Sequence, residues 1–191
     1  MAMLLGRWRR RRDRGLRHTA HALYGCIVER ARDPVFYQEY RVPDTLDGRF
    51  DLLVLQCYLV LRRLRAAGEA GERLAQETFD VMIEDLDRNL REIGVGDLSV
   101  GKKVKVMARA FYGRVAAYEA GLAEDAEDGA LAEALRRNVY RGEADVPAAA
   151  LAGHVRAIAA EIDGLPLEPM LAGRLDPGPA GSPGEIAEGA A

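Results

Sequence analysis

The stretch from Leu52 to Leu61 is apolar except for one glutamine, and it lies inside a longer segment with helical periodicity. A helix that crosses a bilayer needs about 20 apolar residues, so this shorter stretch predicts a core helix and no membrane span. A helix that is apolar nearly all round needs neighbours on several sides. We therefore expect it at the centre of the fold, capped by Asp44 or Thr45 and ending before Gly68.

The overall composition favours helices. Apolar residues make up 49% of the 191 residues, charged residues 30% and aromatic residues only 6%. Ala, Leu, Arg and Glu predominate, and these residues form helices readily. We expect an all-α, single-domain helical bundle of about six helices around the central apolar helix. The expected helices span residues 16–32, 45–65, 72–93, 99–122, 129–141 and 147–163, with short turns within 34–40 and 166–175.

Composition also divides the chain into three parts. Residues 1–15 form a basic N-terminal segment, and residues 16–175 carry the helical periodicity of the main domain. Residues 176–191 are rich in Gly, Pro and Ala and hold few large apolar side chains. Because so few apolar groups cannot offset the entropy lost on ordering, we expect a disordered tail there.

The third and fourth predicted helices form a hairpin whose two arms carry opposite charge. Opposite its apolar stripe, the third helix is acidic and the fourth is basic. Gly94 suits the end of the third helix, and Ser99 suits the N-cap of the fourth. Lys102 and Lys103 lie in the first turn of the fourth helix, where cations oppose the helix dipole. Either the acidic side of the third helix or an anionic partner must favour them, and the sequence leaves both open.

The segment GDLSVGKK nearly matches a phosphate-binding loop. Gly96, Gly101 and Lys102 have the spacing of that motif, but Lys103 occupies the position of the Ser or Thr that would hold magnesium. Such loops follow a buried β-strand, whereas this segment follows an amphipathic helix. A connection between two helices therefore explains the segment better than a nucleotide site does.

No pattern of catalytic or metal-binding residues stands out. His18 and His21 lie three residues apart, but arginines surround them and His154 is the only other histidine. The carboxylates lie on expected solvated helix faces, and no base accompanies a nucleophile. Cys26 and Cys57 lie in apolar segments and are expected to be buried, reduced thiols. We expect a protein that is not an enzyme and binds no metal, cofactor or small-molecule substrate.

The beginning of the chain is rich in arginine. Trp8 is followed by Arg9, Arg10, Arg11 and Arg12. These residues are candidate contacts to a membrane surface, because Trp suits the headgroup region and each cation contributes roughly 1 kcal/mol at an anionic surface. The phosphates of ribosomal RNA would satisfy the same charges, and a solubilising tail is a third interpretation. No secretory signal is evident, so we expect a cytoplasmic protein, with peripheral attachment to the inner membrane left open.

Three segments resemble a known family: LYGCIVERARDPVFY (23–37), PDTLDGRFDLLVLQCYLVLRRL (43–64) and LDRNLREIGVGDLSVGKKVKVMARAFYGR (86–114). They are similar to the ubiquinol–cytochrome c chaperones, bacterial relatives of the mitochondrial factor that escorts newly made cytochrome b into the bc1 complex. The most specific piece is IGVGDLSVGKKV (93–104). The resemblance covers residues 23–118 well and the C-terminal helices more loosely.

The resemblance implies a helical chaperone without cofactor chemistry, which binds newly made cytochrome b and promotes assembly of the cytochrome bc1 complex. A different hypothesis is a ribosome- or RNA-associated adaptor that binds phosphates through the basic N-terminus and the fourth helix. The sequence does not say whether a second chaperone subunit takes part. On the chaperone hypothesis the hairpin is the candidate partner-binding surface, with Asp97, Ser99, Lys102, Lys103 and Lys105 at its tip and Phe111 and Tyr112 behind the tip.

Overall fold

The computed structural model describes residues 2–175, with side chains described from residue 14 onward. Within that range every regular element is a helix, which confirms the predicted all-α class. The six longer helices correspond to the six expected ones, and the short α2 and α8 correspond to the two expected turns. The predicted tail, residues 176–191, lies outside the described residues. The helices are α1 (Ala2–Ala31), α2 (Val35–Gln38), α3 (Leu46–Arg65), α4 (Gly68–Glu92), α5 (Asp97–Leu122), α6 (Ala130–Asn138), α7 (Ala148–Gly164) and α8 (Leu167–Leu171).

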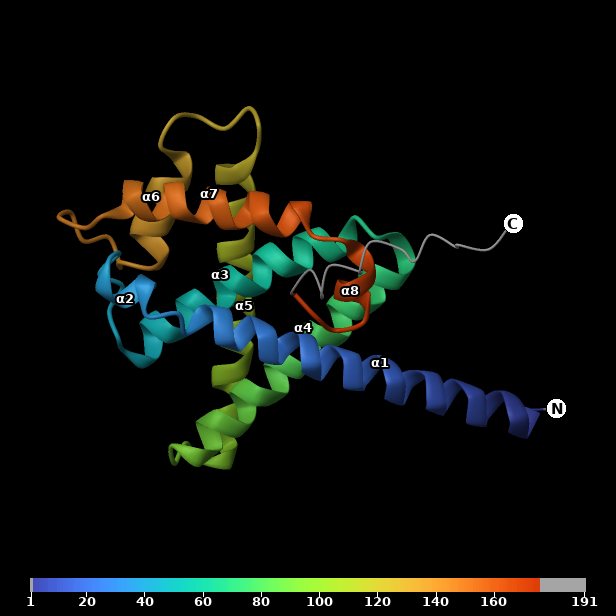
Figure 1. The fold of residues 1–191 in the computed structure, drawn as a ribbon. Coiled ribbons are helices and arrows are strands. Elements are labelled where there is room, and N and C mark those ends of the chain that lie inside the picture. The colour runs from blue at the N-terminus through green and yellow to red at the C-terminus, as the bar shows by residue number, and fades with distance from the viewer. Residues whose placement is uncertain (1, 176–191) are drawn as a thin grey trace, which may run out of the picture.

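Helix α3 lies at the centre of the fold, as its apolar run predicts. It packs against α1, α4, α5 and α7 (Figure 1), and nearly all its side chains from Asp51 to Leu61 are buried. Thr45 caps the helix, because its Oγ1 accepts a hydrogen bond from the Gly48 N–H at 3.1 Å. A Cβ at Gly48 would lie 2.0 Å from the carbonyl oxygen of Pro43, so only glycine fits this tight entry to the helix.

The remaining helices pack on α3 and on one another. Helices α1 and α4 contact α3 and lie side by side, while α6 packs between α5 and α7 (Figure 1). The short α8 touches α3 and α4. Helices α4 and α5 converge on a short connection that projects from the rest of the molecule in Figure 1, so the expected hairpin is present. No helix among the described residues is long and apolar enough to cross a bilayer.

Two helices start earlier than the sequence predicts. Helix α1 begins at Ala2 instead of near residue 16, because arginine forms helices readily and no proline interrupts the segment. Helix α4 begins at Gly68 instead of Glu72. A Cβ at Gly71 would lie 1.9 Å from the carbonyl oxygen of Leu64, so this glycine lets the first turn of α4 pack directly on the end of α3.

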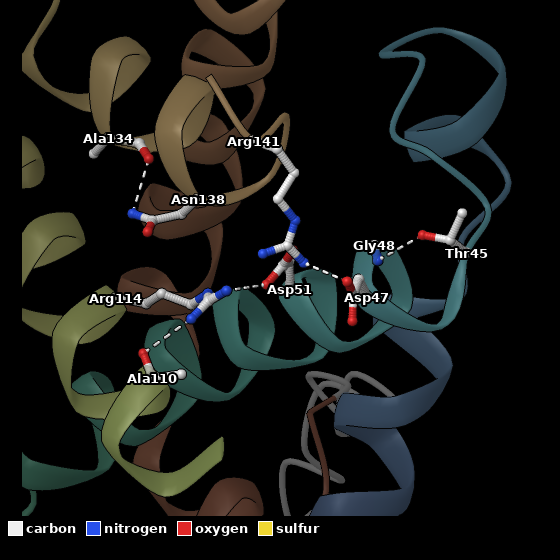
Figure 2. A network of polar contacts seen from close by, with 9 residues as sticks. All are labelled: Thr45, Asp47, Gly48, Asp51, Ala110, Arg114, Ala134, Asn138 and Arg141. Atoms are coloured by element: carbon white, nitrogen blue, oxygen red, sulfur yellow. Dashed lines mark hydrogen bonds and ion pairs between the residues drawn. The ribbon is translucent and has the colours of Figure 1, made fainter. Parts of the chain in front are cut away.

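A buried ion-pair cluster joins α3, α5 and the segment after α6 (Figure 2). The Asp51 side chain is fully buried, with Arg114 of α5 at 2.7 Å from its Oδ1 and Arg141 at 2.8 Å from its Oδ2. Arg141 also lies 3.4 Å from Asp47 and has a φ of 56°, a conformation that few non-glycine residues adopt. The Arg114 guanidinium lies 5.5 Å from the centre of the Phe50 ring. One carboxylate therefore holds three segments that are far apart in sequence.

The charge state of this cluster follows from competing effects. Burial raises the pKa of Asp51 to about 6, while the positive charges of Arg114 and Arg141 act in the opposite direction. The carboxyl group is therefore mainly ionised at neutral pH and pairs with both guanidinium groups, while Arg141 also has Asp47 as a partner. The Arg114 side chain is itself only 12% exposed, so little water is available to replace the carboxylate.

We expect Asp51→Ala to lower the free energy of unfolding by about 3–5 kcal/mol, because it leaves buried guanidinium charge without a partner. Urea denaturation followed by circular dichroism measures this change. Asp44→Ala is the matched control, since Asp44 pairs with Arg49 at 2.6 Å on the exposed surface, where water screens the charges. Equal effects of the two substitutions would contradict the structural importance of the buried cluster.

The two cysteines differ in environment. Cys57 is fully buried in α3 and its thiol donates to the Met82 sulfur at 3.5 Å. Cys26 on α1 is only half-buried, so the expectation of two buried thiols holds for Cys57 alone. Burial raises the pKa of the Cys57 thiol from 9.0 to about 12, which leaves almost no reactive thiolate at pH 8.

In native protein at pH 8, we expect iodoacetamide to alkylate Cys26 and to leave Cys57 unmodified. Denaturant should expose Cys57, restore its ordinary thiol pKa and make both residues reactive. Mass spectrometry of the tryptic peptides measures the two sites separately. Equal native labelling would contradict the burial of Cys57.

Candidate functional site

The hairpin connection is tighter than the sequence predicts. Gly94 has a φ of 86°, which confirms it as the end of α4. Helix α5 begins at Asp97 with Gly96 as its N-cap, so the prediction that Ser99 caps the helix is wrong. Ser99 instead lies inside the first turn, and its N–H donates to the Gly96 carbonyl at 2.8 Å. The helix starts earlier because Gly96 already has the extended backbone of an N-cap residue.

An ion-pair bridge holds this connection. Arg91, in the last turn of α4, contacts Asp87 of its own helix at 2.6 Å and also contacts Asp97 of α5. The Asp97 carboxylate lies in the first turn of α5, where the helix dipole favours negative charge. Gly101 and Lys102 of the near-match to a phosphate-binding motif are both helical, so this segment forms the start of α5 and no loop.

An aromatic cluster fixes the two arms of the hairpin against each other. The Phe79 ring of α4 lies 5.0 Å from the Phe111 ring and 5.5 Å from the Tyr112 ring, both on α5. Phe111 is 2% exposed, so this candidate partner-binding residue has almost no surface that a partner could reach. Its ring supports the hairpin from inside, while Tyr112 is 57% exposed.

The acidic side of α4 faces α1. Arg17 of α1 lies 3.3 Å from Glu77 and also contacts Glu84. The Tyr24 hydroxyl, also on α1, donates to Asp85 at 2.9 Å. The apolar stripes of α4 and α5 face the core, which leaves the acidic side of α4 to α1. Of the two explanations for the lysines of α5, pairing with the acidic side of α4 therefore has no support from these contacts.

The basic side of α5 is exposed to solvent. Lys102, Lys103, Lys105 and Arg109 are all exposed. Among residues 14–175, no ion pair within 4 Å involves any of these four cations. The predicted candidates Lys102, Lys103 and Lys105 are thus available to a partner.

Exposed apolar side chains gather on the same hairpin. Where side chains are described, five large apolar residues are strongly exposed, and four of them belong to the hairpin. Three lie on α5, namely Leu98 at 93%, Val106 at 62% and Tyr112 at 57% exposure, and Ile93 at 59% lies in the connection. Sequence analysis named Tyr112 as a candidate but did not identify Ile93, Leu98 and Val106, because the apolar stripes indicated only the buried faces. Leu98 and Val106 lie off the stripe of α5, and this position is the sequence signal for their exposure.

A groove with a volume of about 860 Å³ opens between the end of α1, α2, the start of α3 and the hairpin. Leu46 and Ile93, two of the exposed apolar residues, line it from α3 and from the hairpin connection. Exposed Leu46 follows the Thr45 cap directly, where its position in the first turn faces away from the core. The groove is also lined by apolar and aromatic side chains that include Tyr24, Tyr37, Phe50, Leu53, Leu90 and Met107.

The other residues considered from sequence lie outside this region. Trp8 and the candidate contacts Arg9, Arg10, Arg11 and Arg12 lie in the first part of α1, of which the structure describes the backbone only. His18 and His21 are exposed on α1, whereas His154 stacks on the Tyr40 ring at 4.8 Å. The three histidines are therefore not brought together.

The comparisons with known proteins point to one family. A family profile described as "Ubiquinol-cytochrome C chaperone" matches residues 38–177. A solved structure titled as that of the Cbp3 homolog from Brucella abortus has 38% sequence identity and a TM-score of 0.75. The alignment covers 91% of this chain and 94% of that one, so the likeness extends over most of both chains.

Relatives among characterised proteins carry a consistent name. Ubiquinol-cytochrome-c reductase complex assembly factor 1 of Xenopus laevis is 29% identical over 65% of this chain and 62% of its own length. The human protein of that name is 26% identical over 65% of this chain and 41% of its own length. This chain therefore matches between two fifths and two thirds of those relatives. From its profile match and its helical architecture, the chain belongs to the ubiquinol–cytochrome c chaperone family.

Proposed function

We propose that this protein is a non-enzymatic assembly chaperone that binds newly made cytochrome b and promotes assembly of the cytochrome bc1 complex. The family description and the name shared by its relatives support a role in assembling ubiquinol–cytochrome c reductase. A membrane subunit exposes apolar segments before it is inserted, so a chaperone for it needs an apolar surface that remains accessible. The groove beside the hairpin is such a surface, and it is the observation that carries the proposal.

The groove suits one apolar segment of the client. Its volume of about 860 Å³ lies at the upper end of ordinary ligand sites, and aromatic and aliphatic side chains dominate its lining. Leu46 and Ile93 stand at two of its edges with most of their surface exposed. A bound apolar segment would cover both, and covering a leucine or isoleucine fully is worth about 1.5–3 kcal/mol.

The predicted tip residues remain candidates for partner binding. Lys102, Lys103, Lys105 and Tyr112 are exposed on α5, and Asp97 and Ser99 are exposed at its start. We propose that the protein acts in the cytoplasm and can attach peripherally to the inner membrane. The ribosome is a further proposed partner if the client is caught during its synthesis.

The alternative function is a ribosome- or RNA-associated adaptor. The exposed cations of α5, which have no ion-pair partner among residues 14–175, favour it, because phosphates would satisfy them. Phosphate binding would not use the apolar groove, so the adaptor is the second of the two hypotheses.

Deleting the gene should lower the assembled bc1 complex and its cytochrome b while unrelated respiratory enzymes keep their normal levels. Native gel electrophoresis and haem spectra of isolated membranes measure this. Restoring the intact gene is the control. Normal bc1 levels, together with ribosome co-sedimentation that weakens as salt rises, would instead support the adaptor.

Leu46→Glu combined with Ile93→Glu should reduce crosslinking of cytochrome b by at least about tenfold, because charges replace two apolar edges of the groove. Both side chains are exposed, so the fold should survive. Photo-crosslinking in membranes, read as cytochrome b peptides, measures the effect.

The matched control is Ala149→Glu with Ala150→Glu, which adds the same charge to exposed positions of α7 away from the groove. The control variant should crosslink cytochrome b as the unmodified protein does. Unchanged crosslinking by the Leu46→Glu/Ile93→Glu variant would exclude the groove as the client site.

A further inference from the structure

The outward face of α5 combines exposed cations with exposed large apolar side chains. At about 100° of rotation per residue, Leu98, Lys102, Lys105, Arg109 and Tyr112 fall within a narrow arc of the helix. All five are exposed, and Val106 stands at the edge of the arc. We call this set, with Val106, the α5 outer face. Contact with water favours the cations of this face, but it does not favour the exposed apolar side chains beside them.

Between the two ends of α5, no carboxylate of the helix itself offsets the positive charge of this face. No acidic residue occurs in α5 between Asp97 in its first turn and Glu119 near its end. Some other described cations, such as Arg17, Arg30 and Arg91, have carboxylate partners in contact. Within the side-chain-described part of the chain, the cations of the α5 outer face have none within 4 Å. The face therefore presents free positive charge to whatever lies outside it.

The space over the face is open. A Cβ added at Gly101 or Gly113, which both lie near the arc, would meet no atom within 4 Å. Small residues at these positions leave the long lysine, arginine, leucine and tyrosine side chains free to project. The side chains of the α5 outer face are themselves exposed, so a partner can reach them.

We propose that the α5 outer face docks on the surface of a bilayer that contains anionic phospholipids. Lysine and arginine would contact the headgroup phosphates, while Leu98 and Val106 would enter the boundary between headgroups and acyl chains. Tyr112 suits the same depth, because its ring is apolar and its hydroxyl is polar. Nucleic acid fits less well, since exposed aliphatic side chains gain nothing from a phosphate backbone. This inference rests on the peripheral attachment proposed above and assigns that attachment to a surface of α5 that is distinct from the groove.

Docking in this way leaves the groove accessible. Met107 lines the groove from α5. Lys105 and Arg109 each lie two residues from Met107, which is about 200° of rotation, so they point to the opposite side of the helix. A protein held at a membrane through the α5 outer face would keep the groove open for an apolar segment. The two surfaces can therefore be tested separately.

The test is flotation of the purified protein with phosphatidylcholine vesicles, with and without phosphatidylglycerol. We expect binding only when phosphatidylglycerol is present, and weaker binding as salt rises. Lys102→Glu with Lys105→Glu should lower the affinity by at least about tenfold. Arg137→Glu with Arg174→Glu changes the net charge equally at exposed positions outside α5 and should have much less effect. Equal losses in the two variants, or no binding of the unmodified protein, would overturn the proposal.

Two further measurements distinguish the α5 outer face from the basic N-terminal segment as the membrane contact, and a membrane from RNA as the partner. Deleting residues 2–13 removes Trp8 and the neighbouring arginines, and vesicle binding should persist. Loss of binding in this deletion, with normal binding by Lys102→Glu/Lys105→Glu, would overturn the assignment to α5. Titration with a single-stranded homopolymer RNA at the same salt should give weaker binding than the anionic vesicles. Stronger binding to RNA would instead assign the face to nucleic acid.

A fluorescence measurement checks the depth of insertion. Trp8 is the only tryptophan, so Trp8→Phe combined with Leu98→Trp places a single reporter on the face. Its emission should shift to shorter wavelength with anionic vesicles, and an absent shift would exclude insertion at Leu98. The purified protein suffices for all these measurements, so their failure would leave cytochrome b binding untouched. Conversely, failure to capture cytochrome b would not affect vesicle binding.

Discussion

The buried carboxylate of Asp51 sets the position of much else in this fold. Two guanidinium groups from separate segments converge on it, and they tie α5 to the central helix and close the segment after α6 (Figure 2). Ion pairs of this kind contribute little net stability compared with apolar packing, but they are costly to break and they favour one arrangement. The contact of Arg114 and the burial of Val100, Phe111 and Tyr118 together set the orientation of α5 about its own axis. That orientation directs Met107 toward the groove and Lys105 toward solvent.

The two arms of the hairpin have different electrostatic environments. The acidic side of α4 is compensated inside the molecule, since Arg17 and Tyr24 of α1 contact its carboxylates. The basic side of α5 has no such compensation among the residues with described side chains. The acidic and basic sides that look complementary in the sequence therefore do not pair with each other. The acidic side of α4 pairs within the fold, and the basic side of α5 is open to a partner. The apolar groove lies beside this open half, which places two different surfaces on one hairpin.

The sequence predicted the helices well because their signals are local. Periodicity located the six long helices, and Thr45 and Gly94 marked two boundaries through backbone chemistry that depends on few neighbours. Ser99 was assigned wrongly as a cap because Gly96, three residues earlier, already supplies the required backbone. The candidate site was predicted less completely. The exposure of Leu46 and the burial of Phe111 depend on packing between helices, which periodicity cannot give.

The contacts of Asp51 also constrain the order in which the chain can fold. The carboxylate is near the start of α3, whereas Arg114 and Arg141 come much later in the chain. A nascent chain that has produced only α1, α3 and α4 lacks both guanidinium partners, and burying the carboxylate without them is unfavourable. The central helix can therefore reach its final environment only after the segment containing Arg141 has been synthesised. The groove, which depends on α3 and α5 being in place, should accordingly form late in folding, so that a partly made chain has no finished groove.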